Sequence, residues 1–151
     1  MTELTILVLV LAVAVAVGLL LRYRAGRVRA TAVAPADPDA AARDRLLAAV
    51  GVTGSAPAVL HFSADWCGPC DAVRRVVAGV VADLAEAPQP PLDIEVDIDA
   101  EPALAKELNV LSLPTTFIFD ADRRERFRIS GVPKATDLHS AITPLTVRDA
   151  A

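Results

Sequence analysis

A long apolar segment near the start of the chain limits what this sequence can fold into. Residues 4–21 read LTILVLVLAVAVAVGLLL, and Thr5 and Gly18 are the only members outside the strongly apolar set. As a helix rising about 1.5 Å per residue, this segment would extend about 27 Å, close to the hydrocarbon thickness of a bilayer. We therefore expect a single N-terminal transmembrane helix, with a cleaved signal peptide and a buried core helix as alternatives.

The charges around the apolar segment favour an uncleaved anchor. The chain starts Met-Thr-Glu, whereas Arg22, Arg24, Arg27 and Arg29 follow the segment. A signal peptide has a basic start and a shorter apolar core, which is the opposite arrangement. The positive-inside rule places such a basic flank in the cytoplasm, so we expect the following domain to face the cytoplasm at the cell membrane. The arginines are also suited to contact anionic lipid headgroups.

The remaining composition is that of one ordinary domain. The chain has 151 residues, of which 54% are hydrophobic, and its formal net charge is -4. The mean hydropathy of +0.44 excludes a disordered chain. The absence of a second long apolar segment argues against a multi-span membrane protein. The charge is split, since residues 1–29 carry +3 and the remainder carries -7. An acidic domain of this kind argues against nucleic-acid binding.

The hydrophobic periodicity predicts an α/β domain. We expect an anchor with its basic segment over 1–29, a linker over 30–39, a domain over 40–147 and a tail over 148–151. Apolar alternation and runs predict strands, and a 3.6-residue period predicts helices. The order indicates a mixed sheet covered by helices on both faces. The expected helices are 43–50, 67–85, 102–108 and 134–142, and the expected strands are 58–63, 92–98, 115–119 and 125–129.

Two cysteines carry the chemistry of the sequence. Cys67 and Cys70 stand three residues apart where an apolar strand turns into a helix, and the chain has no other cysteine. At a helix N-terminus the free N–H groups stabilise a thiolate, which is the attacking form in thiol–disulfide exchange. A zinc site would need four ligands. The chain has no second cysteine pair, so both of its histidines, His61 and His139, would have to complete the set. We therefore predict no metal and no cofactor.

The segment FSADWCGPC resembles the active-site segment of the thioredoxin family. The likeness extends to Ser112-Leu113-Pro114-Thr115, which resembles the loop with a cis-proline, and to Gly131, which resembles the glycine closing the substrate groove. The resemblance implies a thioredoxin fold and a protein disulfide oxidoreductase. It also implies that Cys67 is the nucleophile and Cys70 the resolving cysteine. The substrate groove it implies comprises Trp66, Gly68, Pro69, Leu113, Pro114 and Gly131.

Two of the positions at which the sequence departs from the family concern the buried proton carrier. Thioredoxins usually carry a buried aspartate six residues before the first cysteine and a lysine on the neighbouring strand. His61 and Glu95 stand there instead. Because imidazole titrates near neutral pH, it can take and return a proton. Our hypothesis is that His61, oriented by Glu95, moves the proton of Cys70, and the alternative is a histidine buried for packing or for a hydrogen bond.

Three functions are compatible with these features. The first is a membrane-tethered disulfide reductase that acts on protein disulfides and receives electrons from a thioredoxin reductase or a small thiol. The second is an extracytoplasmic thiol–disulfide enzyme for protein folding or cofactor maturation, which needs the opposite orientation in the membrane. The third is a non-catalytic module that holds a partner in the groove around Pro114. The intact cysteine pair and the arginine bias favour the first.

Overall fold

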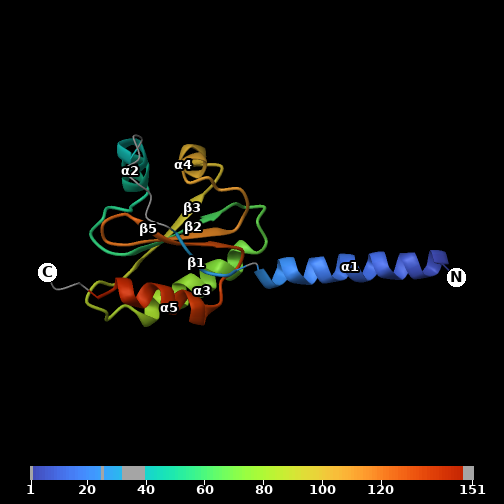
Figure 1. The fold of residues 1–151 in the computed structure, drawn as a ribbon. Coiled ribbons are helices and arrows are strands. Elements are labelled where there is room, and N and C mark those ends of the chain that lie inside the picture. The colour runs from blue at the N-terminus through green and yellow to red at the C-terminus, as the bar shows by residue number, and fades with distance from the viewer. Residues whose placement is uncertain (1, 25, 32–39, 148–151) are drawn as a thin grey trace.

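A computed structural model describes residues 2–24, 26–31 and 40–147, with the side chains of 5–20 in the first helix (Figure 1). The expected tail and linker positions 32–39 and 148–151 lie outside the described residues. Each expected strand and helix of the domain is present, some with shifted ends. They are α2 (Ala40–Ala49), β2 (Ala58–Ser63), α3 (Cys70–Asp83), β3 (Leu92–Asp97), α4 (Pro102–Glu107), β4 (Thr115–Phe119), β5 (Glu125–Ser130) and α5 (Ala135–Ile142), followed by the short helix η1 (Thr143–Leu145).

The described strands form one mixed sheet between two helical layers. Its order is β1-β5-β4-β2-β3, in which β2 runs parallel to β3 and antiparallel to β4. Helices α3 and α5 cover one face, and α2 and α4 lie over the other (Figure 1). The layers follow from strand alternation, because Val59 packs with Val77 of α3, whereas Leu60 packs with Leu47 of α2.

Strand β2 is the centre of the sheet and ends at the cysteine pair. All six of its residues are buried, which explains why its sequence is a continuous apolar run broken by one histidine. Its register places His61 opposite Glu95 of β3 and opposite Thr116 of β4. The residues that follow Ser63 form the turn that leads into α3. The buried strand therefore fixes the position from which the turn projects.

A short edge strand is absent from the sequence prediction. Strand β1 (Arg29–Ala30) pairs with β5, and Thr31 N–H donates to the carbonyl of Arg126 at 2.9 Å. Residues 30 and 31 therefore belong to the sheet and not to the expected linker over 30–39. The alternation of arginine with Val28 and Ala30 over 27–30 is the available signal.

Gly26 fixes the position at which the chain joins the β1–β5 edge of the sheet. Its φ is +77°, and its N–H donates to the carbonyl of Ser130 at 2.6 Å. A Cβ at this position would lie 2.1 Å from the carbonyl oxygen of Val132. Glycine alone accommodates both the positive φ and the close approach.

Helix α1 (Thr2–Arg24) extends away from the domain (Figure 1). Its apolar side chains are exposed, from 50% for Val17 to 68% for Leu9. Over residues 2–24, 26–31 and 40–147, no helix combines the length and hydropathy needed to cross a membrane. The structure therefore does not support the transmembrane helix that we expected over 4–21.

Candidate functional site

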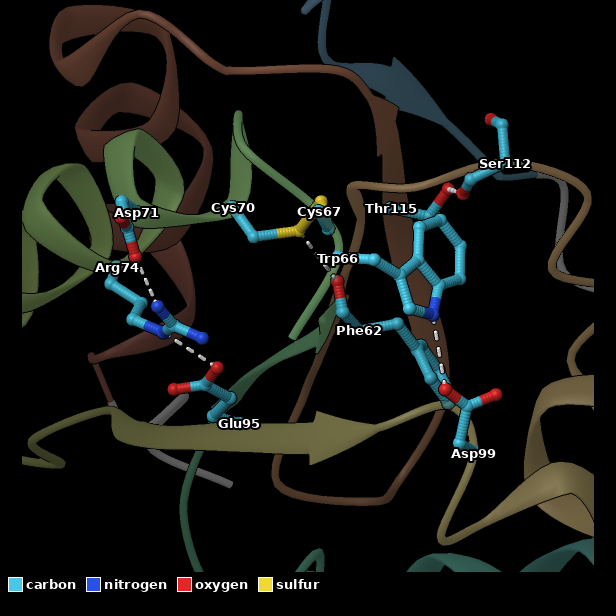
Figure 2. The surroundings of a disulfide bond; sticks show 10 residues. All are labelled: Phe62, Trp66, Cys67, Cys70, Asp71, Arg74, Glu95, Asp99, Ser112 and Thr115. Carbon is cyan, nitrogen blue, oxygen red and sulfur yellow. Dashed lines mark hydrogen bonds and ion pairs between the residues drawn. A yellow bond between two sulfur atoms is a disulfide. The ribbon is translucent and has the colours of Figure 1, made fainter. Parts of the chain in front are cut away.

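Cys67 and Cys70 form a disulfide at the turn between β2 and α3 (Figure 2). Their Cα atoms are 5.5 Å apart, and the Cys70 N–H donates to the Cys67 carbonyl at 3.1 Å. Helix α3 begins at Cys70 and not at Cys67, where the sequence predicts its start. The reason is that Gly68 and Pro69 form a turn, and Pro69 with φ -69° is the cap of the helix. Cys67 therefore lies just before the free N–H groups of the helix.

The two cysteines differ in their exposure to solvent. Cys67 is 8% exposed and Cys70 is 1% exposed. Cys70 Sγ lies 3.9 Å from the carbonyl oxygen of Phe62, which is placed to accept its S–H when the pair is reduced. A Cβ added at Gly68 would meet nothing within 4 Å, so the outer side of the turn is open. A substrate can therefore approach Cys67 first.

The predicted groove loop lies against the disulfide. The Leu113–Pro114 peptide bond is cis, as the resemblance implied. Leu113 packs against the cluster that contains both cysteines. Thr115 Oγ1 donates to the Ser112 carbonyl at 2.7 Å (Figure 2). Gly131 N–H donates to the Pro114 carbonyl at 2.8 Å. The fold thus brings Leu113, Pro114 and Gly131 to one edge of the cysteine turn.

Trp66 is the exposed wall of the same turn. Its side chain is 70% exposed, and its indole Nε1–H donates to Asp99 Oδ2 at 3.1 Å (Figure 2). Asp99 follows β3, and its own N–H donates to Asp97 Oδ1 at 2.8 Å. From the sequence pattern alone, these carboxylates are no more than a polar strand end. In the structure they orient the tryptophan, which sequence spacing could not show because the residues come from the ends of different strands.

His61 is buried on the α3 side of the sheet, but its partner differs from our hypothesis. His61 is 2% exposed, and its Nε2 lies 3.1 Å from Asp93 Oδ1. Glu95, which we expected to orient it, instead accepts a hydrogen bond from Arg74 Nε at 2.7 Å. The physical reason is that Arg74 of α3 crosses above Glu95, which leaves the diagonal neighbour Asp93 for the imidazole. Asp93 is absent from the sequence-based site.

Arg74 joins α3 to the edge of the sheet. It bridges Glu95 and Asp71, and the hydrogen bond to Glu95 raises the pKa of Arg74 above its usual value (Figure 2). Burial acts to raise the pKa of Glu95, but hydrogen bonds from Ser63 and Arg74 and the charge of Arg74 outweigh it. The net pKa of Glu95 is lower than its usual value.

Replacement of Glu95 with glutamine should lower stability in a pH-dependent way. Because the pKa of Glu95 is lower in the folded chain, the ion pair stabilises the fold above about pH 4.3, the usual glutamate pKa. That stabilisation is lost as the pH falls through the lower pKa that Glu95 has in the folded chain. Since Glu95 is 36% exposed, the loss at pH 7 should stay below about 1 kcal/mol. Urea unfolding at pH 7 and pH 3 measures it, with exposed Glu86→Gln as the control, and a pH-independent difference would contradict it.

Within the described residues, the polar side chains show no arrangement for a metal ion. The described part of the chain contains no group of three or more His, Cys, Asp and Glu residues able to hold one. His139, the second histidine, forms a hydrogen bond with Thr143 at 3.1 Å within the last helical segment. What the site offers is a reversible disulfide beside an open groove.

Comparison with known proteins agrees with this geometry. The thioredoxin family profile matches residues 47–144. The chain is 35% identical to thioredoxin of Pyropia yezoensis over 56% of its length and 77% of that protein. It is 33% identical to thioredoxin 1 of Synechococcus elongatus over 64% of this chain and 88% of that protein.

Solved structures give the same relationship. A mutant thioredoxin of Halobacterium salinarum superimposes with a TM-score of 0.54 at 30% identity, covering 66% of this chain and 83% of that chain. Oxidised mitochondrial thioredoxin 3 of Saccharomyces cerevisiae superimposes with a TM-score of 0.53 at 26% identity. The match covers 62% of this chain and 83% of that chain. The chain therefore belongs to the thioredoxin family and is a protein-disulfide reductase with a Cys67–Cys70 active site.

Proposed function

We propose that this chain is a membrane-tethered disulfide reductase in which Cys67 attacks the substrate and Cys70 releases it. The observation that carries the proposal is the unequal burial of the two cysteines beside the Leu113–Pro114 loop. An attacking thiolate must reach the substrate, whereas a resolving cysteine needs to reach only its neighbour. Cys67, the more accessible of the two, lies just before the N-terminus of α3, where a thiolate is stabilised.

The reaction transfers two electrons to the substrate. The Cys67 thiolate attacks one sulfur of a substrate disulfide, so a mixed disulfide forms and the first substrate thiolate leaves and takes up a proton. Cys70 loses its proton and attacks Cys67 Sγ, so the protein disulfide forms and the second substrate thiolate leaves. The substrate is reduced to a dithiol, and the enzyme is oxidised to the state in Figure 2. A thioredoxin reductase or a small thiol would restore the dithiol.

The groove residues hold the substrate during the first step. Leu113 packs against the cysteine cluster, and its backbone would pair with an extended substrate segment, as in β-strand addition. Trp66, hydrogen-bonded to Asp99, lines the turn beside Cys67. Gly68 and Pro69 leave the space above Cys67 open. Protein segments with an accessible disulfide fit this arrangement.

His61 and Asp93 provide a route for the proton of Cys70. Helix α3 begins at Cys70, and strand β3, which carries Asp93, pairs with the strand that carries His61. Asp93 is 33% exposed, so the pair connects a buried imidazole to solvent. A histidine so placed can accept the Cys70 proton and pass it outward.

Substitution of His61 with alanine should slow release of the substrate. General base assistance contributes about 10²-fold at the low end of its range, so the second exchange step should slow by about that factor at pH 7. The measurement is decay of a preformed mixed disulfide on Cys67 between pH 5.5 and 8. Asp93→Asn, which keeps the imidazole, should show a smaller loss. An unchanged rate and pH profile in His61→Ala would contradict the proton route.

The tether is proposed from the exposed apolar face of α1 and the arginines that follow it. An apolar helix with side chains this exposed needs lipid or protein cover, and the basic flank favours a cytoplasmic domain. We expect the full chain in the membrane fraction after alkaline carbonate washing. A membrane-impermeant thiol reagent should label reduced Cys67 only after lysis. Recovery in the supernatant would contradict the tether, and labelling of intact cells would contradict the orientation.

A further inference from the structure

A basic groove continues from the active site along the edge of the sheet. It encloses about 310 Å³ and lies between the Leu113 loop and the paired strands β1 and β5. No carboxylate is among its lining residues in the described part of the chain. The lining includes Arg27, Arg29, Ser112, Leu113, Arg128 and Gly131.

The sheet register places like charges together in this groove. Arg29 of β1 is directly opposite Arg128 of β5. Like charges facing each other across a strand pair are destabilising unless a counter-charge is present. Arg128 has one, because it donates two hydrogen bonds to the buried carboxylate of Glu125, at 3.0 and 3.2 Å. Arg29 is exposed and has no ion pair within residues 2–24, 26–31 and 40–147. Its charge is therefore available to an anionic ligand.

The groove and the redox site share a residue. Leu113 lines the groove and also packs against the cluster of Cys67 and Cys70. Gly26, held by its bond to Ser130, fixes the segment that carries Arg27 and Arg29 beside this loop. A substrate segment bound along Leu113 would extend directly over the arginines.

We infer that the arginines of this edge select substrate segments that carry carboxylates beside the target disulfide. The inference rests on the proposed function, because it names the substrate class of the same site. Charge complementarity at the rim of a binding site acts mainly through encounter and specificity. The N-terminal segment that connects α1 to the domain is thus a specificity element. Lipid headgroups are the competing ligand, and the shared lining residue Leu113 favours the substrate.

The test compares two synthetic peptides that differ only in charge. Each has one intramolecular disulfide, flanked by three aspartates in the first and three asparagines in the second. The fully reduced full chain in uncharged detergent is mixed with each peptide, and the second-order rate constant of reduction is measured. We expect Arg27→Gln/Arg29→Gln to lower the rate for the acidic peptide by about fivefold and to leave the neutral peptide unchanged. Salt should reduce the acidic preference of the unaltered chain and not that of the variant.

Matched variants separate charge from structure. Arg45→Gln/Arg124→Gln removes the same charge at exposed positions outside the groove and should leave both rates unchanged. Arg27→Lys/Arg29→Lys should restore most of the acidic preference. Equal rates for the two peptides in the unaltered chain, or an equal loss on both in the variant, would overturn the inference. So would an effect of the variant on binding to phosphatidylserine nanodiscs without an effect on the peptides. If the unaltered chain reduced neither peptide, the proposed function itself would fail.

Discussion

Substitution of Cys67 with serine should abolish disulfide reduction, with a loss of at least about 10³-fold. A serine hydroxyl is not appreciably ionised at neutral pH and cannot form the mixed disulfide through which electrons pass. The measurement is reduction of a peptide disulfide by the full chain with dithiothreitol as the electron source, corrected for the reaction of dithiothreitol alone.

The matched control is Cys70→Ser. It keeps the attacking thiolate and should complete the first step but stop at the mixed disulfide. The two variants should therefore both lack turnover but differ in the accumulation of an adduct. Substantial turnover in Cys67→Ser, above the dithiothreitol background, would contradict the assignment of the nucleophile.

Substitution of Phe117 with alanine should cost about 3–5 kcal/mol of the free energy of unfolding. Phe117 is fully buried in β4, and its ring centroid lies 5.9 Å from that of Phe62 and 6.2 Å from that of Phe119. The guanidinium of Arg128 lies 4.6 Å from the same centroid, so the change also removes a cation–π contact. The loss is a large fraction of the roughly 5–15 kcal/mol typical of a domain.

Urea unfolding of the full chain in uncharged detergent measures this loss. Val147→Ala is the control, because that side chain is 57% exposed and should change stability by less than about 0.5 kcal/mol. A cost below about 1 kcal/mol for Phe117→Ala would show that the sheet and the α2–α4 layer do not pack around this ring.

Most elements of the domain could be predicted because local pattern and tertiary packing agree in them. The alternation in β3 and the 3.6-residue period in α3 each reflect one buried face. The predicted start of α3 is wrong by three residues because the turn formed by Gly68 and Pro69 has no hydrophobic signal. Strand β1 escapes prediction because a two-residue strand exists only through its partner, β5, about a hundred positions later in the chain.

The residues of the candidate site that belong to recognisable sequence motifs could be predicted. The cysteine pair, the Leu113–Pro114 loop and Gly131 meet as the resemblance implied. The partner of His61 could not be predicted, since the choice between Glu95 and Asp93 depends on where Arg74 of α3 crosses the strand. Side chains from three elements compete there, and sequence spacing along one strand does not determine the outcome.

In the proposed reaction, Cys67 exchanges disulfides with a substrate and Cys70 completes the exchange. Mass spectrometry of the Cys70→Ser variant, mixed with a disulfide-containing peptide and quenched with acid, tests it most directly. We expect a covalent adduct in which a peptide cysteine is joined to Cys67, and no such adduct in Cys67→Ser. Absence of the adduct in the Cys70→Ser variant, while the unaltered chain reduces the same peptide, would contradict it.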